Sequence, residues 1–118
     1  MAPSNPYLSV KPMLDIPGMR EALTESRATK VAVSPLIGGL AVKGPLVKLM
    51  EDLNIEAGNS GIASVYEGII DSFIIDQDDV ADAEALRHRF GFNVEVISTL
   101  INTPERAETL ARHIISLS

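Results

Sequence analysis

Three short apolar runs alternate with segments of helical spacing, and this alternation most constrains the fold. The runs predicted as strands are 30–34, 72–76 and 93–97. The first two are nearly continuous in Val, Ile and Ala, which is typical of strands buried on both faces of a parallel sheet. The predicted helices cover 17–23, 45–53, 60–69, 78–90 and 103–115. Strands that alternate with helices predict a three-layer, Rossmann-like α/β fold with a mainly parallel sheet and right-handed crossovers.

The length of the chain limits the domain organisation. Its 118 residues fit one compact domain with a real core, so we predict a single α/β domain over 1–118. Three strands make only half of a doubly wound sheet. The expectation is therefore an incomplete half of a larger doubly wound domain. Because its apolar strands would then leave open edges, we expect the chain to form a homo-oligomer.

Composition and charge exclude several classes of function. Sixteen acidic residues against ten basic ones give a net charge of −6, which argues against a nucleic-acid partner. The absence of cysteine excludes disulfides and cysteine-ligated zinc and is compatible with a reducing compartment. The longest uncharged run, 31–42, is too short for a membrane span, and residues 1–4 lack the pattern of a signal peptide. We expect a cytoplasmic protein without a membrane partner.

The segment from Val31 to Pro45 is the strongest candidate for a ligand-binding loop. A strand leads into adjacent glycines at 38–39, followed by Lys43-Gly44 and a proline suited to the start of a helix. In open α/β sheets, ligands bind beyond the carboxyl ends of the strands. Glycines there let backbone N–H groups approach an anion. Since the loop matches neither a Walker A motif nor G-x-G-x-x-G, a purely structural turn stays open as the alternative.

Other polar residues allow both a functional and a structural interpretation. Asn5, in a Ser-Asn-Pro turn, could bind phosphate or ribose, or could close an Asx-turn on its own backbone. Lys43 could neutralise a phosphate or be a solvated lysine. The run 76–79 could imitate a magnesium site, but capping of the next helix by Asp78 or Asp79 explains it more simply. We expect His88 and His113 at the surface, and the pattern assigns no catalytic residue.

Three segments, in order, resemble the C-terminal part of the 2-phospho-L-lactate transferase family of coenzyme F-420 biosynthesis. They carry long motifs that span nearly the whole chain. The matching residues are Pro3-Ser4-Asn5-Pro6 with Ser9, Pro12 and 17–23; Val33 to Gly39 with Lys43-Gly44-Pro45 and Met50; and Tyr66 to Asp71 with Phe73, Ile75 and Asp76. The chain is therefore similar to the C-terminal portion of a larger transferase.

The sequence also departs from the family pattern. Ala2 stands where the family usually has Gly, and Glu67-Gly68 replaces a Gly-Asp pair. Ser64 and Val65 occupy the place of an Arg-His pair, and Ser98 that of an Asp. The family's N-terminal Gly-rich loop and the aspartates that resemble its metal site have no counterpart here.

The resemblance implies an activity and a set of binding residues. The parent would transfer a phospholactyl, phosphoenolpyruvyl or phosphoglyceryl group from a GDP-activated donor to the deazaflavin Fo, with Mg²⁺ bound outside this chain. The residues that would hold the donor nucleotide and its phosphates are Ser4, Asn5, Ser9, Gly38, Gly39, Lys43 and Gly44. The alternatives are a non-enzymatic regulatory protein of the same superfamily that binds a nucleotide sugar, and an inactive structural fragment.

Overall fold

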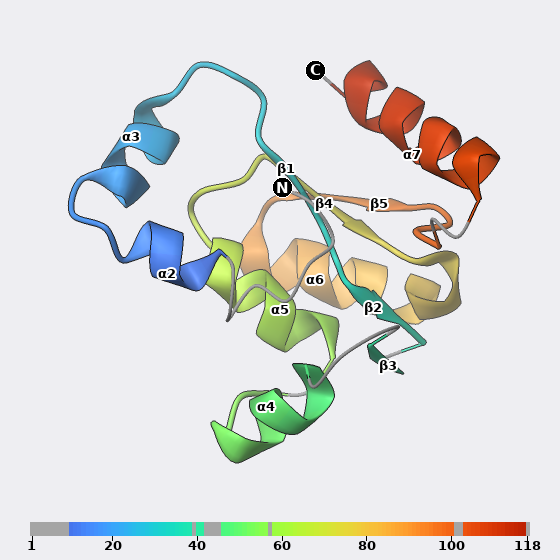
Figure 1. Cartoon of the computed structure of the whole chain (residues 1–118), viewed down its shortest axis with the longest axis horizontal. Coiled ribbons are helices and arrows are strands. Elements are labelled where there is room, and N and C mark those ends of the chain that lie inside the picture. Colours follow the sequence, from blue (N-terminus) through green and yellow to red (C-terminus); the bar gives the residue numbers. More distant parts are fainter. Residues whose placement is uncertain (1–9, 39, 42–45, 57, 101–102, 118) are drawn as a thin grey trace.

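The computed structural model describes residues 10–38, 40–41, 46–56, 58–100 and 103–117. The predicted helices and strands occur in the predicted order, together with a short helix and a hairpin that were not predicted (Figure 1). The helices are α2 (Lys11–Leu14), α3 (Met19–Glu25), α4 (Leu46–Asp52), α5 (Asn59–Tyr66), α6 (Ala83–Phe90) and α7 (Pro104–Ser116), with a 3₁₀ segment, η1 (Gln77–Asp82), before α6. The strands are β1 (Val31–Val33), β2 (Leu36–Ile37), β3 (Leu40–Ala41), β4 (Ser72–Ile75) and β5 (Asn93–Val96).

The main sheet is parallel and has β4 between β1 and β5. Ala32 lies opposite Phe73, which in turn lies opposite Val94. The three predicted strands are thus confirmed as neighbours in one sheet, although each is one or two residues shorter than predicted. Because the strands are parallel, their carboxyl ends lie at one common edge.

Helices α5 and α6 cover one face of this sheet. Ala32, Phe73 and Val94 point to this side and pack with Ile62 and Tyr66 of α5 and with Leu86 of α6 in one continuous core. Tyr66, Phe73, Ile62 and Leu86 are almost completely buried. Tyr66 and Phe73 also make an aromatic contact, with ring centroids 6.3 Å apart.

Helix α7 covers the opposite face. Val31, Val33 and Ile74 point to this side and pack against Leu110 of α7. Successive strand residues thus alternate between two cores, as the pleat requires. Figure 1 shows α5 and α6 on one side of the sheet and α7 on the other. The α/β fold predicted from the sequence is confirmed, and this layering is that of a Rossmann-like fragment.

The structure corrects several local predictions. Residues 11–14 form the short helix α2, which is not among the helices predicted from the sequence. The stretch predicted as a loop after β1 contains an antiparallel hairpin, in which Ile37 pairs with Leu40. The helix predicted from 78 begins instead as the 3₁₀ segment η1, and its capping side chain is Asp76, not Asp78 or Asp79.

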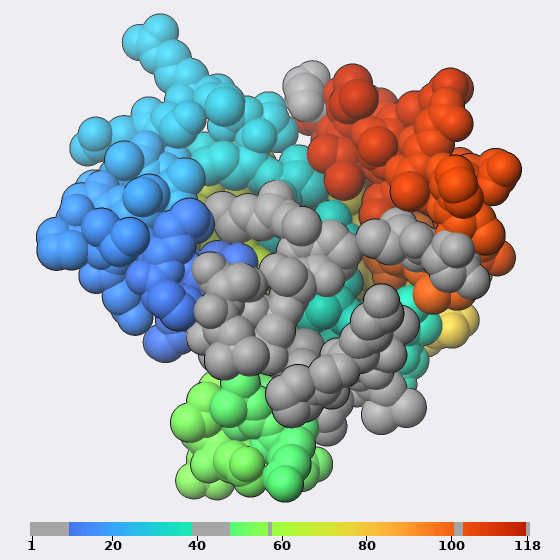
Figure 2. All heavy atoms as spheres, in the orientation of Figure 1, coloured from blue at the N-terminus to red at the C-terminus, as the bar shows by residue number. Residues whose placement is uncertain are grey.

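Helices α4 and α7 lie at the outside of the molecule. On the face seen in Figure 2, α4 and α7 lie at separate corners. Met50 of α4 is buried in the larger core, while Leu53, just beyond the end of that helix, is 54% exposed.

No helix in the described parts of the chain is both long and apolar enough to cross a membrane.

Candidate functional site

Polar side chains gather where the three parallel strands end. Ser34 directly follows β1, Asp76 directly follows β4, and Thr99 lies three residues after the end of β5. Each is at least 95% buried. Buried polar groups are costly unless hydrogen bonds satisfy them, so this edge depends on a specific network. It is also the edge at which α/β sheets bind ligands.

Asp76 connects the ends of β4 and β5. Its Oδ1 accepts hydrogen bonds from the backbone N–H of Thr99 at 2.8 Å and from the Thr99 hydroxyl at 3.2 Å. Its Oδ2 accepts from the backbone N–H of Asp78 at 2.9 Å and so caps η1. These three donors occupy both carboxylate oxygens. Asp76 is therefore a structural residue of the site.

A second chain of contacts joins the end of β1 to the start of α5. The Ser34 hydroxyl donates to Oδ1 of Asn59 and accepts from the backbone N–H of Leu36. The Asn59 amide in turn donates to Oδ2 of Asp82 at 3.2 Å. Asn59, the first residue of α5, is 1% exposed, so its amide is fixed by these partners. Both polar ends of this side chain are used.

Asp79 of η1 reaches the tip of the β2–β3 hairpin. The backbone N–H of Gly38 donates to Oδ2 of Asp79 at 3.1 Å. Gly38 has φ of +62°, a left-handed conformation that glycine adopts at little cost. Burial raises the pKa of the Asp79 carboxyl, and the charges of Asp82 and Asp76 raise it further, while hydrogen bonds from Gly38 and Asn59 oppose the shift.

The described residues include one of the predicted ligand-binding positions. Gly38 lies at the strand-end edge, at the tip of the β2–β3 hairpin, where its N–H group contacts Asp79. The other predicted positions, Ser4, Asn5, Ser9, Gly39, Lys43 and Gly44, lie outside the described residues. Their assignment as binding residues stays a prediction.

The structure bears on the metal alternative for residues 76–79. Within the described ranges, no three His, Asp or Glu side chains are grouped so that they could hold a metal ion. The carboxylates of Asp76 and Asp79 instead accept backbone N–H groups. The capping interpretation is confirmed for the run, with Asp76 as the capping residue. We therefore assign these side chains no metal-dependent step.

Sequence reasoning missed several members of this network. Ser34, Asn59, Asp82 and Thr99 are not among the predicted site residues, although Ser34 is the last residue of a predicted strand and Thr99 closely follows another. Their position at the end of a strand is the available signal, because the carboxyl ends of parallel strands converge. Asn59 and Asp82 carry no such signal, since they join the site only through packing of α5 and η1.

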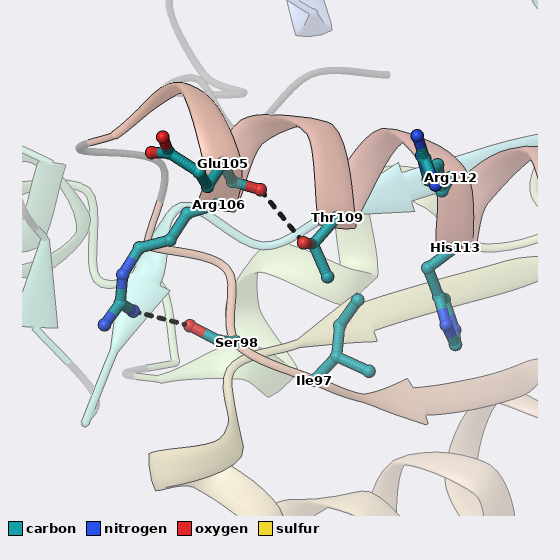
Figure 3. A pocket seen from close by; sticks show the side chains of 7 residues that line it. All are labelled: Ile97, Ser98, Glu105, Arg106, Thr109, Arg112 and His113. Atoms are coloured by element: carbon teal, nitrogen blue, oxygen red, sulfur yellow. Dashed lines mark hydrogen bonds between the residues drawn. The ribbon is translucent and has the colours of Figure 1, made fainter.

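A groove lies between α7 and the chain that leaves β5. Its volume is about 460 Å³. Figure 3 shows Ile97 and Ser98 below the helix, and the Arg106 guanidinium, which donates to the Ser98 hydroxyl at 3.3 Å. The lining residues are Ile97, Ser98, Glu105, Arg106, Thr109, Arg112 and His113. Cationic and apolar side chains thus lie beside the last strand, a few residues from Thr99.

The surface position predicted for His113 is confirmed only in part. Its side chain is 30% exposed, but its Nε2 atom is buried, without a hydrogen-bond partner among the described residues. Nε2 lies 3.8 Å from Oε2 of Glu95 on β5. His88 is exposed, as predicted.

Comparison of the sequence with known proteins shows the family of the chain that carries this strand-end site. The family model described as 2-phospho-L-lactate transferase CofD matches residues 1–115. The chain belongs to this family. The match covers both the hairpin that carries Gly38 and the strand ends that carry Asp76 and Thr99. The resemblance noted from the sequence motifs is therefore confirmed.

Curated relatives from archaea and bacteria are similar over nearly all of the chain. The 2-phospho-L-lactate transferase of Methanosarcina mazei is 38% identical over 98% of this chain, and that of Methanosarcina acetivorans is 37% identical over 99%. The phosphoenolpyruvate transferase of Mycolicibacterium smegmatis is 27% identical over 95%. These matches cover 37%, 37% and 34% of the relatives, so the chain spans little more than a third of their length.

Proposed function

We propose that this chain forms the nucleotide-binding part of a phospholactyl transferase. The match of residues 1–115 to the transferase family supports this proposal most strongly. The β2–β3 hairpin supports it as well, because its tip lies at the carboxyl edge of a parallel sheet, although the Gly38 N–H is already donated to Asp79. In this proposal the loop that continues from the hairpin, through Lys43 and Gly44, binds phosphate groups of the donor.

The proposed donor is a GDP-activated phospho-carboxylate, and the proposed acceptor is the deazaflavin Fo of coenzyme F-420 biosynthesis. The relatives include both a 2-phospho-L-lactate and a phosphoenolpyruvate transferase, so the transferred group could be phospholactyl or a related acyl phosphate. Magnesium belongs to the proposal through the family, with ligands outside the described residues. We also propose a cytoplasmic location, as expected from the sequence.

Donor binding can be tested by isothermal titration of a full-length parent with GDP. Lys43→Ala and Asn5→Ala should each weaken binding about ten- to a hundredfold, because a charge-assisted contact to phosphate contributes roughly 1.5–3 kcal/mol. Lys48→Ala is the matched control, since Lys48 is an exposed lysine of the neighbouring helix α4. Unchanged affinity in both variants would return Lys43 and Asn5 to a structural role.

The transfer reaction separates the proposal from its alternatives. We expect the 118-residue chain to be inactive with Mg²⁺, donor and Fo, since its described residues offer no metal site. A full-length parent should convert Fo, as followed by chromatography. Conversion of Fo by the 118-residue chain would show that the catalytic site is complete within it. A parent that binds GDP but never converts Fo would favour the regulatory protein.

A further inference from the structure

The β2–β3 hairpin has a tight turn. In the sequence, the hairpin precedes the loop predicted to bind phosphate. Ile37 and Leu40 face each other across the hairpin, so only residues 38 and 39 connect the strands. Ala41 ends β3, and the next residues in the sequence, 42–45, include Lys43 and Gly44. In the sequence, the hairpin therefore directly precedes the segment proposed to bind phosphate.

Asp79 is well placed to fix that orientation. It is 7% exposed and lies at a bend inside η1, with φ of −106° and ψ of 20°. The bend and the hydrogen bond from Asp79 N–H to Asp76 O, at 2.9 Å, keep the residue tied to the end of β4. Its side chain reaches from η1 to the N–H of Gly38.

We propose that Asp79 is a positioning residue whose carboxylate anchors the hairpin tip through the Gly38 N–H, and thereby holds Gly38, a predicted donor-binding position, at the strand-end edge. The anchor itself follows from the described contact, whereas its effect on a ligand rests on the proposed function. Asp79 need not touch the ligand, because it acts through the hairpin.

The surroundings of Asp79 make the anchor sensitive to pH. Among the described residues, the groups that act on its carboxyl are the N–H of Gly38, the amide of Asn59, and the carboxylates of Asp82 and Asp76. Burial and the two carboxylates raise the pKa of Asp79. An ionised carboxylate accepts a stronger hydrogen bond than a protonated one. The anchor should therefore weaken as the pH falls through the titration of Asp79.

Nuclear magnetic resonance of the ¹⁵N-labelled chain tests the anchor without any ligand. The amide proton of Gly38 should shift with pH in one step, with a midpoint above the ordinary aspartate value of 3.8. In Asp79→Ala, the protection of this amide from exchange should fall about tenfold, as expected for the loss of a charge-assisted bond. Asp79→Asn keeps an acceptor, so it should retain most of the protection but lose the titration step.

Asp78→Ala is the matched control, because Asp78 is the exposed neighbour in the same 3₁₀ segment. It should leave the protection and titration of Gly38 unchanged. A Gly38 amide that does not titrate in the wild type, or whose protection survives Asp79→Ala, overturns the anchor. If Asp79→Ala does not fold, the wild-type and Asp79→Asn titrations decide the same question.

Titration with GDP tests the effect on the ligand. Asp79→Ala should weaken GDP binding several-fold, Asp79→Asn should restore most of it at neutral pH, and Asp78→Ala should have no effect. If the wild type binds no GDP, the proposed function fails, while the Gly38 amide still decides the anchor. If the wild type binds GDP and Asp79→Ala loses the anchor but keeps the affinity, the positioning role is overturned.

Discussion

Asp76 holds Thr99 by two hydrogen bonds, from the backbone N–H at 2.8 Å and from the hydroxyl at 3.2 Å, across 23 residues of sequence. Both residues are at least 95% buried. This contact fixes the chain that leaves β5 against the end of β4. The ends of β4 and β5 are therefore linked to each other at the base of the strand-end site.

Asp76→Ala should lower the free energy of unfolding by about 3 kcal/mol. The change removes two bonds to Thr99 and the cap of η1, and it leaves the buried N–H of Thr99 without its acceptor. Urea denaturation followed by circular dichroism measures it. Thr99→Val is the control, because it removes only the hydroxyl bond and should cost about 1 kcal/mol. A loss below that value in Asp76→Ala would contradict the structural role.

Gly61→Ala should also destabilise the fold, by roughly 2 kcal/mol, although alanine is the better helix former. A Cβ atom at this position would lie 1.9 Å from the carbonyl oxygen of Glu56 and 2.7 Å from Cε of Met50. The backbone around Glu56 would have to move. Thermal unfolding of the variant measures the effect.

Gly68→Ala tests the cost of a left-handed backbone without a steric clash, for comparison with Gly61→Ala. Gly68 has φ of +77° but no atom within 4 Å of the added Cβ, so alanine there pays only for the left-handed backbone, about 1 kcal/mol. Gly61→Ala should be the more damaging of the two. The opposite order would show that α5 has more room around Gly61 than the structure indicates.

Asp79→Asn should raise thermal stability at neutral pH. The pKa of Asp79 is raised in the folded state, chiefly by burial, so the folded protein binds this proton more tightly than the unfolded chain. The stabilising contribution is then present at acid pH and is lost as the pH rises through the raised pKa. The gain in thermal stability from Asp79→Asn should therefore shrink as the pH falls toward 3.8, the ordinary pKa of an aspartate.

Calorimetric melting of wild type and Asp79→Asn over a pH series checks this sign. Asp78→Asn provides the baseline, since it removes an equal charge from an exposed neighbour. A variant that melts below the wild type at neutral pH would mean that the carboxylate stabilises the fold, which contradicts the raised pKa.

The chain should self-associate in solution. Large apolar side chains that are more than half exposed lie on several parts of its surface: Ile16, Leu53, Val80 and Ile115. The net charge of −6 opposes association, but at physiological salt its repulsion is screened over about 8 Å. Sedimentation velocity across a concentration series should show species larger than a monomer. A single monomeric species at every concentration would contradict this expectation, and high salt should strengthen association.

The strands, the order of the elements and the ends of some helices could be read from the sequence. Gly91 closes α6 with φ of 74°, and Thr103 caps α7, as local patterns predict. The run Phe73-Ile74-Ile75 indicated a strand covered on both faces, and its side chains do enter two different cores. These features depend on neighbours within a few residues, so the sequence carries them directly.

The hairpin and the strand-end network depended on contacts between distant parts of the chain. The strands of the hairpin have two residues each, too few for a periodic pattern, and Gly38 finds Asp79 only across 41 residues. Asp76 caps η1 with one carboxylate oxygen, and its other oxygen accepts the buried N–H of Thr99, 23 residues away. Local propensity determined which segments form strands and helices, whereas packing decided which polar groups meet, since burial leaves each of them few possible partners.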